Sequence, residues 1–559
     1  MTISRFSKFA SLISLLALSS LAFAGVGSSN TAIADPPVPH PHTAPCKVVL
    51  FNHYRFADFN PKSFTYTPPA NCAAPWAKVI LVSDFSVTAG IQYDRTANIW
   101  IGPTNIYFGT TSEPDPSDAR HWQVQRDLTD YSSIFTTSQQ GTVDLGNVVN
   151  KTYTGVIYGT STLYFYPVPP KKSAPVTADQ VIAYSAGSTG GTVALDTTGA
   201  CCQPTLSQTL TLPTNMQRIY FDVFAQSQHD DEFWYTCVPN DVSSELESCP
   251  NTAFRESEIT IDGVPAGVAP VYPWIFTGGI DPYLWFPIPG VQTLNFVPYR
   301  VDLTPFAGAL DDGNPHTIAF GVYNAANYFS VTASLLLYLD HGSAQDSGAV
   351  TTNTLTAPSP VINENIVVSK NGISGTVNTS SAHNFQISGY VNTSAGPVTT
   401  TIAQDINFSN VQKFTINDTS YIQDITQDTT IQSTSTVTNA NGTYVDEVSF
   451  GWPLTMDIVL AFNPDGSGSQ TTTVSQSYGQ NEQATLNGKT VLFSVLGNSV
   501  TPTDDLLFDS SGYITGNQNQ SSAQNYYAYE ASGYCYSKSL TAANNILTGI
   551  TIGQGCHKK

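Results

Sequence analysis

The chain has 559 residues, with 42 acidic and 21 basic side chains and a formal net charge of -21. A surface of this sign repels nucleic acid and the anionic face of a membrane, so we exclude both as partners. A neutral partner such as a sugar is compatible with this charge.

The first 24 residues are typical of an export signal. Arg5 and Lys8 form a short basic start, an apolar run follows over residues 9–21, and Ala22-Phe23-Ala24 ends it before Gly25. The run is too short to span a bilayer comfortably, and no later stretch is long and apolar enough. We therefore expect a secreted or periplasmic protein that has no membrane contact after signal removal.

Residues 25–44 contain several prolines and little apolar material, which predicts an extended leader without a core. From about Cys46 the chain consists of short β-branched and aromatic runs bounded by turn residues. Clear examples are the runs at 47–51, 78–82, 97–101 and 155–158. This pattern predicts a β-sandwich over residues 45–168.

Prolines, glycines and the Cys201-Cys202 pair interrupt the strand pattern between residues 169 and 212, where we expect a connector. Strand-like runs return over residues 213–345 and predict a second sandwich. Later residues are rich in Thr, Ser, Asn and Gln and alternate only partly, as in an antiparallel sheet with one wet face. Residues 346–559 are therefore expected to form a C-terminal β-rich region.

Eight cysteines in an exported chain favour disulfides over metal thiolates, and we expect neither a metal nor a cofactor. The adjacent Cys201 and Cys202 could bond each other or leave one thiol free. Sequence spacing suggests three local pairs, Cys46 with Cys72, Cys237 with Cys249, and Cys535 with Cys556.

Common catalytic signatures are missing, including those of zinc proteases, P-loop proteins and α/β-hydrolases. The first stretch that can carry chemistry is Tyr93-Asp94-Arg95, just before the strand expected at 97–101. A carboxylate at a strand end can face a cleft, where neighbouring cations would hold it ionised. The alternative is a structural ion pair that caps the strand.

The second stretch, residues 230–234, places Asp230, Asp231 and Glu232 before Phe233 and Trp234. Three consecutive carboxylates repel each other, so at least one should have the raised pKa that a general acid needs. Aromatic rings beside acids are also a way to hold sugars. The alternatives are an acidic surface loop or a calcium site.

Three further stretches could line a pocket, namely Ser112-Glu113-Pro114, Phe254-Arg255-Glu256 and residues 276–287, the last with Asp281 and Trp285. Large aromatics such as Trp285 and Trp274 belong to a core more often than to a ligand platform.

These stretches form part of an ordered series over about residues 45–345 that resembles the peptide-N-glycosidase A family of acid-active glycoamidases. The other landmarks are Tyr66-Thr67-Pro68-Pro69, Asp144-Leu145-Gly146-Asn147, Ile261-Asp262-Gly263, Thr277-Gly278-Gly279-Ile280 and Asp302-Leu303-Thr304-Pro305-Phe306. A fainter resemblance reaches the peptide-N-glycosidase F type, through residues 93–98 and 231–233.

The resemblance implies an all-β fold, with two jelly-roll-like β-sandwich domains as the catalytic unit. It makes Asp94 the principal catalytic carboxylate and Glu232 the acid across the domain interface. The F type has a further carboxylate near residues 122–126, where this chain offers glutamines, and Glu113 or Glu256 could substitute. The expected substrate-binding residues are Arg95, Asp231, Trp234, Glu113, Arg255, Glu256, Asp281 and Trp285.

The implied reaction is hydrolysis of the amide that joins Asn to the first N-acetylglucosamine, which leaves Asp and a glycosylamine. N-glycoproteins and glycopeptides would be the substrates. Two alternatives remain from the residues alone: a secreted carbohydrate-binding protein without turnover, and a glycosidase that acts within the N-glycan core.

Overall fold

The computed structural model of the chain describes residues 24–199 and 201–556. Nearly all regular structure is antiparallel β-sheet, accompanied by short 3-10 helices and one α-helix, α1 (Ala307–Leu310). The expected all-β class is confirmed. The predicted export signal lies outside the described residues apart from Ala24.

The first sandwich consists of two four-stranded sheets. One has the order β1 (Cys46–Phe56), β8 (Ile157–Pro167), β3 (Trp76–Val87) and β6 (Arg120–Asp127). The other has the order β2 (Lys62–Tyr66), β7 (Gln139–Leu145), β4 (Thr96–Ile101) and β5 (Thr104–Thr110), and the 3-10 helix η1 (Thr129–Thr136) follows β6. Leu81 and Phe165 of one sheet share a core with Ile99 and Val143 of the other. The jelly-roll description of this unit stays an interpretation.

The second sandwich begins earlier than the sequence pattern suggests. One sheet contains β9 (Gln180–Tyr184), β10 (Val193–Leu195), β17 (Phe329–Leu339), β12 (Met216–Ser227) and β15 (Tyr299–Asp302). The other contains β11 (Thr205–Thr211), β16 (Pro315–Val322), β13 (Glu256–Ile261) and β14 (Val264–Pro270). The expected connector at 169–212 is therefore wrong, because β9, β10 and β11 lie within it and pair with these sheets.

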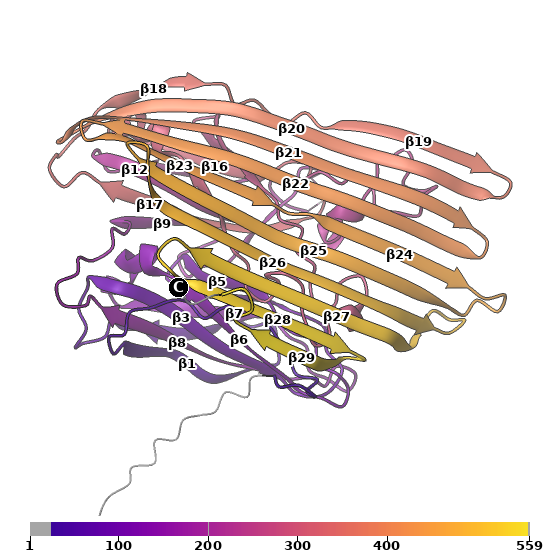
Figure 1. The fold of residues 1–559 in the computed structure, drawn as a ribbon. Coiled ribbons are helices and arrows are strands. Elements are labelled where there is room, and N and C mark those ends of the chain that lie inside the picture. Colours follow the sequence, from indigo (N-terminus) through magenta and orange to yellow (C-terminus); the bar gives the residue numbers. More distant parts are fainter. Residues whose placement is uncertain (1–23, 200, 557–559) are drawn as a thin grey trace, which may run out of the picture.

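Residues after about 350 form one twelve-stranded sheet, which we call the long sheet. Its strands are β18 (Gly348–Asn353), β19 (Val361–Ser369), β20 (Gly372–Thr393), β21 (Gly396–Asn417), β22 (Ser420–Asn439), β23 (Gly442–Gly451), β24 (Leu454–Phe462), β25 (Gly468–Leu486), β26 (Lys489–Phe508), β27 (Ile514–Glu530), β28 (Cys535–Ala543) and β29 (Ile546–Ile552). Figure 1 shows the longest of them running side by side across the whole molecule. Alternate residues of β20 to β22 are buried, as expected for one wet face.

The buried face of the long sheet shares its core with the second sandwich. Phe385, Phe408 and Ile425 of the long sheet belong to the same hydrophobic cluster as Phe221 and Leu335. Buried amide side chains of the long sheet also donate to backbone carbonyls beneath it: Asn410 to Tyr235 (2.9 Å), Gln412 to Cys237 (2.9 Å), Gln423 to Thr236 (3.1 Å), Gln476 to Pro273 (2.7 Å) and Gln520 to Phe286 (2.7 Å). These bonds satisfy loop carbonyls that would otherwise be buried without a partner.

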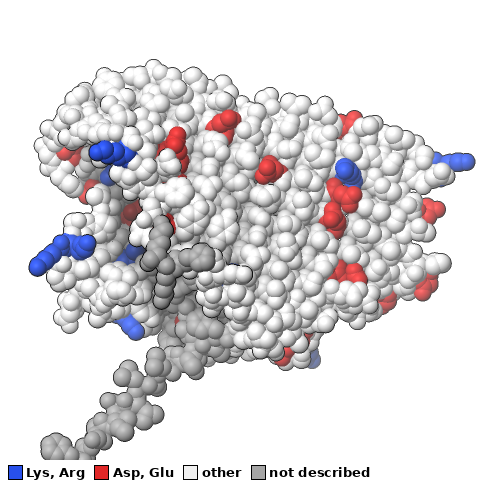
Figure 2. All heavy atoms as spheres, viewed as in Figure 1, with Lys and Arg blue, Asp and Glu red and all other residues white. Residues whose placement is uncertain are grey.

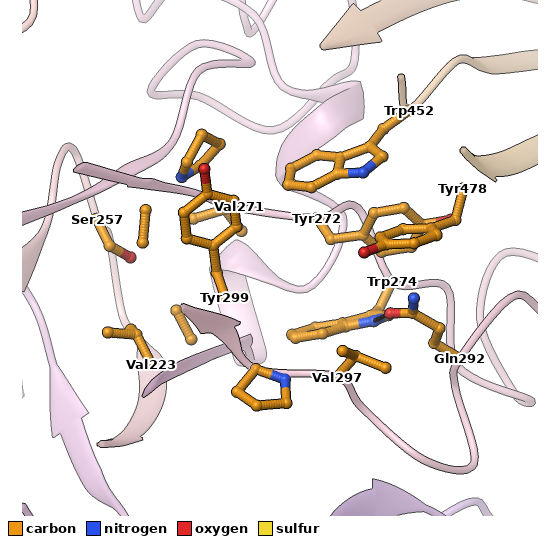
Figure 3. A pocket seen from close by; sticks show the side chains of 14 residues that line it. Val223, Ser257, Val271, Tyr272, Trp274, Gln292, Val297, Tyr299, Trp452 and Tyr478 are labelled. Atoms are coloured by element: carbon orange, nitrogen blue, oxygen red, sulfur yellow. Dashed lines mark hydrogen bonds between the residues drawn. The ribbon is translucent and has the colours of Figure 1, made fainter. Parts of the chain in front are cut away.

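An aromatic cluster continues this contact. Figure 3 shows Trp452 and Tyr478 of the long sheet facing Tyr272, Trp274 and Tyr299. They enclose a cavity of only about 30 Å³, room for little more than a water molecule. Trp274 is buried, which confirms that it belongs to the core.

The leader contributes to the hydrophobic core of the protein, contrary to expectation. Ala32 and Ala34 are buried in the cluster that joins the long sheet to the second sandwich. The Ala34 amide donates to Gln524 Oε1 at 2.9 Å, and the Ala32 amide donates to the Pro287 carbonyl at 2.9 Å. Small side chains allow this extended segment to lie between larger elements, so low hydrophobicity was a poor guide to its burial.

Four disulfides fix local loops. The three expected pairs are present, and Cys201 bonds Cys202. No described cysteine is free. No helix in the described part of the chain is long and apolar enough to cross a membrane. Lys and Arg are few and scattered on the face drawn in Figure 2.

Candidate active site

Asp94 and Glu113 meet at the open end of the β4–β5 hairpin. The register pairs Thr96 with Thr110, so residues just before β4 and just after β5 lie side by side. Thr111 extends the pairing, because its amide donates to the Arg95 carbonyl at 2.9 Å and its Oγ1 accepts from the Arg95 amide at 2.8 Å. The Asp94 amide then donates to Glu113 Oε1 at 3.0 Å.

A turn from the second sandwich covers this pair of carboxyl groups. Thr277 Oγ1 donates to the Thr111 carbonyl at 2.7 Å and fixes the turn against the hairpin. A Cβ atom at Gly278 would overlap with Glu113 Oε1 and lie 2.6 Å from Asp94 Oδ1. Only glycine allows the backbone to approach so closely.

The two carboxyl groups share one hydrogen bond in which Glu113 is the donor. Burial raises the pKa of Asp94 to about 6, although the bond from Glu113, backbone amides that include Gly278, and the charge of Arg95 all lower it. Burial and the negative charge of Asp94 raise the pKa of Glu113 further, to about 8. Near neutral pH the pair therefore holds one proton, on Glu113, and one negative charge, on Asp94.

Glu232 approaches the pair from the other sandwich. It follows β12 directly after the short helix η2 (His229–Asp231), and its side chain is half-buried. Burial and the charge of Asp94 raise the pKa of Glu232 to about 7, while His229 lowers it. The charge of Asp94 therefore acts on Glu232, although the two residues are far apart in sequence and belong to different sandwiches. A raised pKa was expected here, but burial and Asp94 cause it, not the adjacent acids.

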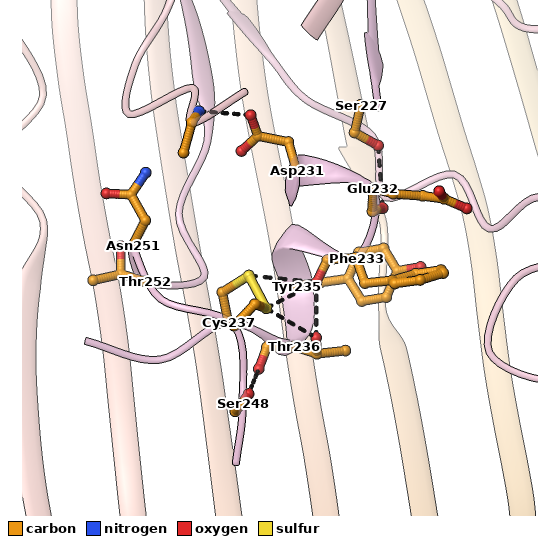
Figure 4. The surroundings of a disulfide bond; sticks show 12 residues. Ser227, Asp231, Glu232, Phe233, Tyr235, Thr236, Cys237, Ser248, Asn251 and Thr252 are labelled. Carbon is orange, nitrogen blue, oxygen red and sulfur yellow. Dashed lines mark hydrogen bonds between the residues drawn. A yellow bond between two sulfur atoms is a disulfide. The ribbon is translucent and has the colours of Figure 1, made fainter. Parts of the chain in front are cut away.

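A disulfide holds the segment that carries Glu232. The Cys237–Cys249 bond lies directly after the 3-10 helix η3 (Trp234–Thr236), and Figure 4 shows Glu232 pointing away from it. Ser227 Oγ donates to the Glu232 carbonyl at 3.3 Å. These contacts fix the backbone while the carboxyl group stays partly open to solvent.

Arg95 does not form the strand-capping ion pair that the sequence left open. Its Nη2 donates to Gln92 Oε1 at 2.7 Å, and its guanidinium lies over the Tyr93 ring at 5.9 Å. No direct ion pair between Arg95 and Asp94 is found among the described residues. The sequence argument that cations would hold Asp94 ionised is outweighed, because burial has the larger effect on its pKa.

Asp231 and Arg255 were expected to bind substrate, and the structure places both in the interior. Arg255 Nη2 and Asp231 Oδ1 are 2.8 Å apart, and both side chains are fully buried. The Ala326 amide donates to Asp231 Oδ2 at 2.6 Å. Figure 4 shows Asp231 and Glu232 pointing in different directions. We reassign the pair to supporting the 231–234 segment.

Four other expected binding residues are also buried. Trp285, in the 3-10 helix η4 (Pro282–Trp285), donates from Nε1 to the Gly279 carbonyl at 2.9 Å and supports the turn over Asp94. Trp234 is buried in the core. Glu256 Oε1 lies 2.9 Å from His383 Nδ1 of the long sheet. Asp281 accepts from the Tyr283 amide at 2.9 Å. None can touch a substrate without rearrangement, so these assignments are corrected.

Sequence reasoning missed side chains whose position depends on the fold. Tyr283 is half-exposed, and its pKa is raised mainly by burial and to a smaller extent by neighbouring charges that include Glu113. Phe233 is half-buried, and one of its ring carbons lies 3.3 Å from where a Gly279 Cβ atom would be. Tyr93 is exposed beside Tyr153, with ring centroids 5.4 Å apart. These rings lie on or near the segments that carry the carboxyl groups and offer apolar faces to a sugar.

Two of the remaining alternatives can be compared with the geometry. The loop at 230–232 is not simply an exposed acidic loop, because Asp231 is buried and Glu232 is half-buried. Across residues 24–199 and 201–556, no group of three His, Cys, Asp or Glu is placed to hold a metal ion.

Comparison with known proteins adds independent information. The family described as peptide N-acetyl-beta-D-glucosaminyl asparaginase amidase A matches residues 36–356. A peptide-N4-(N-acetyl-beta-glucosaminyl)asparagine amidase A from Prunus dulcis is 27% identical over 557 residues, covering 94% of this chain and 92% of that protein.

Among solved structures, PNGase F from Flavobacterium meningosepticum, described as a glycosylasparaginase, matches with 12% identity and a TM-score of 0.36, covering 53% of this chain and 96% of its own. PNGF-II matches with 12% identity and a TM-score of 0.37, covering 53% and 66%.

Proposed function

This chain belongs to the peptide N-acetyl-beta-D-glucosaminyl asparaginase amidase A family, and from that premise we propose how its carboxyl groups release N-linked glycans. The enzyme hydrolyses the amide between an asparagine side chain and the first N-acetylglucosamine of glycoproteins or glycopeptides. Asp94, Glu113 and Glu232 carry the reaction, and Arg95 and the exposed rings near them contact the substrate. Because the sequence predicts an export signal over the first 24 residues, we also propose that the enzyme acts outside the cell or in the periplasm.

Asp94 and Glu113 act as one unit with a single proton. Ionised Asp94 accepts a proton from water as the water oxygen bonds to the amide carbon. Protonated Glu113 donates a hydrogen bond to Asp94. This bond orients the Asp94 carboxylate and keeps the negative charge of Asp94 on one oxygen. Glu232 donates a proton to the amide nitrogen, since an amide nitrogen leaves poorly unless it is protonated. The carbon–nitrogen bond then breaks, giving an aspartate side chain and a glycosylamine.

The single observation that supports these roles best is the electrostatic interaction of Asp94 with two other carboxyl groups that have raised pKa values, one of them from the other sandwich. Asp94 and Glu113 come from the first sandwich, and Glu232 comes from the second. Burying interacting carboxyl groups costs stability, and active sites are where such groups with shifted pKa values gather. A binding protein without turnover has no need of an acid whose pKa lies near neutrality.

Digestion of a glycopeptide followed by mass spectrometry tests the reaction. Conversion of Asn to Asp supports the amidase, a retained single N-acetylglucosamine supports a glycosidase, and an unchanged glycopeptide supports a binding protein. Asp94→Asn should reduce release at least about a hundredfold, because the proton acceptor is lost. The matched control is Asp418→Asn, an exposed residue of the β21–β22 turn, which should release normally. Normal release by Asp94→Asn would overturn the assignment.

A further inference from the structure

A large cavity is lined by residues other than Asp94, Glu113 and Glu232. Its volume is about 550 Å³, within the range of small-ligand sites, which is about 300–1,000 Å³. Five separate parts of the chain line it: the N-terminal segment at Ala24 and residues 31–37, strand β3, strand β6, the segment 289–295, and β28. A cavity that needs so many elements cannot be recognised from one stretch of sequence.

The leader forms a fixed wall of this cavity. Tyr536 donates from its hydroxyl to the Ala34 carbonyl at 3.0 Å, and Lys538 Nζ donates to the Ile33 carbonyl at 2.6 Å. The Val38 amide donates to Gln125 Oε1 at 3.0 Å on the opposite side. Because the leader is bonded to both β28 and β6, the cavity is preformed and needs no ordering when a ligand enters.

The polar wall consists of side chains fixed in one orientation. Gln125 Nε2 donates to Gln123 Oε1 at 3.1 Å, and Gln123 Nε2 donates to Asp84 Oδ1 at 2.8 Å. Both glutamines are half-buried and line the cavity. Each amide keeps a further donor or acceptor for a ligand, since an amide group offers two hydrogens and two lone pairs.

The rest of the lining defines the ligand class. Tyr536 contributes an aromatic ring, Asp35 and Lys538 carry interacting charges of opposite sign, and Asp84 adds a second carboxyl group whose pKa is raised by burial. A wall of oriented amides and carboxyl groups with an aromatic face fits a ligand that has hydroxyl groups and apolar C–H faces. A saccharide has these properties, whereas an anion or a purely apolar molecule does not.

The leader also connects the cavity to the carboxyl pair. Thr31 lines the cavity, and its Oγ1 lies 2.8 Å from Oγ of Ser112, the residue before Glu113. Both hydroxyl groups are buried. A glycan whose first sugar lies at Asp94 and Glu113 has the cavity as a neighbouring place for its later sugars.

We propose that this cavity is a saccharide subsite that binds mannose residues of the N-glycan beyond the first two sugars. The proposal rests on the proposed function for the identity of the glycan, but its binding test needs no catalysis. The probe is the free trimannosyl-chitobiose core, with free chitobiose as the shorter comparison. Isothermal titration calorimetry on the full mature chain gives Kd for both sugars.

Two substitutions at Gln123 test the cavity. Gln123→Ala removes the oriented amide, and Gln123→Trp fills the space. Each should weaken trimannosyl-chitobiose binding about tenfold and leave chitobiose binding unchanged, because one or two hydrogen bonds to the later sugars are lost. Gln140→Ala and Gln140→Trp are the matched controls, since Gln140 is exposed on the other sheet of the same sandwich, and they should bind both sugars normally.

His121→Ala provides a variant that does not disturb the interior, because His121 is exposed and lines the cavity. It should also weaken binding of the longer sugar alone. Equal affinity of the parent protein for both sugars, or no effect of any cavity variant, overturns the subsite. Glycopeptide digestion by the parent protein runs in parallel. Failure of release with selective binding intact rejects the proposed function, and release without selective binding rejects only the subsite.

Discussion

Gly278 determines how closely the second sandwich approaches the carboxyl pair. An added methyl group would overlap with Glu113 Oε1 and lie 2.6 Å from Asp94 Oδ1. Gly278→Ala should therefore displace one of the reacting groups and lower kcat by about tenfold or more, since small displacements are costly in catalysis. Steady-state release from a glycopeptide measures kcat, and thermal unfolding checks the fold.

The control for this prediction is Gly451→Ala at the end of β23. An added Cβ atom there meets nothing within 4 Å. Its kcat should be unchanged. Equal activity of Gly278→Ala and the parent protein would show that the turn does not define the reacting geometry.

The pKa of Glu232 sets an alkaline limit on the reaction. Because its pKa is about 7, the proton that it donates is lost as the pH rises, and kcat/KM should fall above that value. His229 lowers this pKa, so His229→Gln should move the fall to higher pH. The pH profiles of both proteins measure the shift. His341→Gln, at an exposed histidine paired with Asp179, is the control and should leave the profile unchanged. A shift to lower pH would contradict the role of Glu232.

At the scale of elements, the leader behaves as part of the fold. Ala32 and Ala34 lie in the core, and the main chain at 27–28 bonds Leu547 of β29. Deleting residues 25–35 should therefore expose apolar surface and lower Tm, whereas deleting only residues 25–26 removes little buried surface and should not. Differential scanning calorimetry compares the two. An unchanged Tm after the longer deletion would support the extended leader without a core that the composition predicted.

Sequence patterns predicted strands well wherever apolar residues alternate. The sandwiches and the alternation in β21 follow from local residue types, because side chains in a strand point to opposite faces. The strands β9 to β11 were missed because glycine and proline between them look like a connector. The buried glutamines of the long sheet were also missed as core, since a Gln is buried only when a carbonyl in another element accepts from it.

The site was predictable only in part, for a similar reason. The carboxylates at 94 and 232 stand in local motifs, and in the structure the charge of Asp94 acts on Glu232. Pairing of Glu113 with Asp94 depends on the register of the β4–β5 hairpin, which the sequence alone did not show. Asp231 and Trp234 belong to the same motif as Glu232 but point into the interior. A motif therefore locates a functional segment without showing which of its side chains face the substrate.

For the whole molecule, the long sheet is a structural layer and not an appendage. Its residues share one core with the second sandwich, and its amides satisfy loop carbonyls next to the site. Gln470 donates to the Ile280 carbonyl at 3.2 Å, in the turn that covers Asp94. Support for the proposed catalytic carboxylates thus extends from both sandwiches to the long sheet.

Contact between these layers should also make the protein more stable in acid. Asp281 beside η4 and Asp504 of β26 are both buried, and burial together with Asp504 raises the pKa of Asp281 to about 8. The unfolded chain releases this proton near the ordinary value of 3.8, so the folded state retains a proton that the unfolded state has lost. The stability associated with this proton is fully present below about pH 4 and is lost as the pH rises through about 8.

Tm should therefore be higher near pH 5 than near pH 8, as measured by calorimetry in buffers of equal ionic strength. Asp281→Asn replaces the titrating group with a neutral one that keeps a hydrogen-bond acceptor for Tyr283, so it should make Tm less dependent on pH. Asp418→Asn, an exposed change of the same kind, should leave the dependence as it is. A Tm that rises toward pH 8 would contradict this prediction. It would indicate that both Asp281 and Asp504 are ionised in the folded protein.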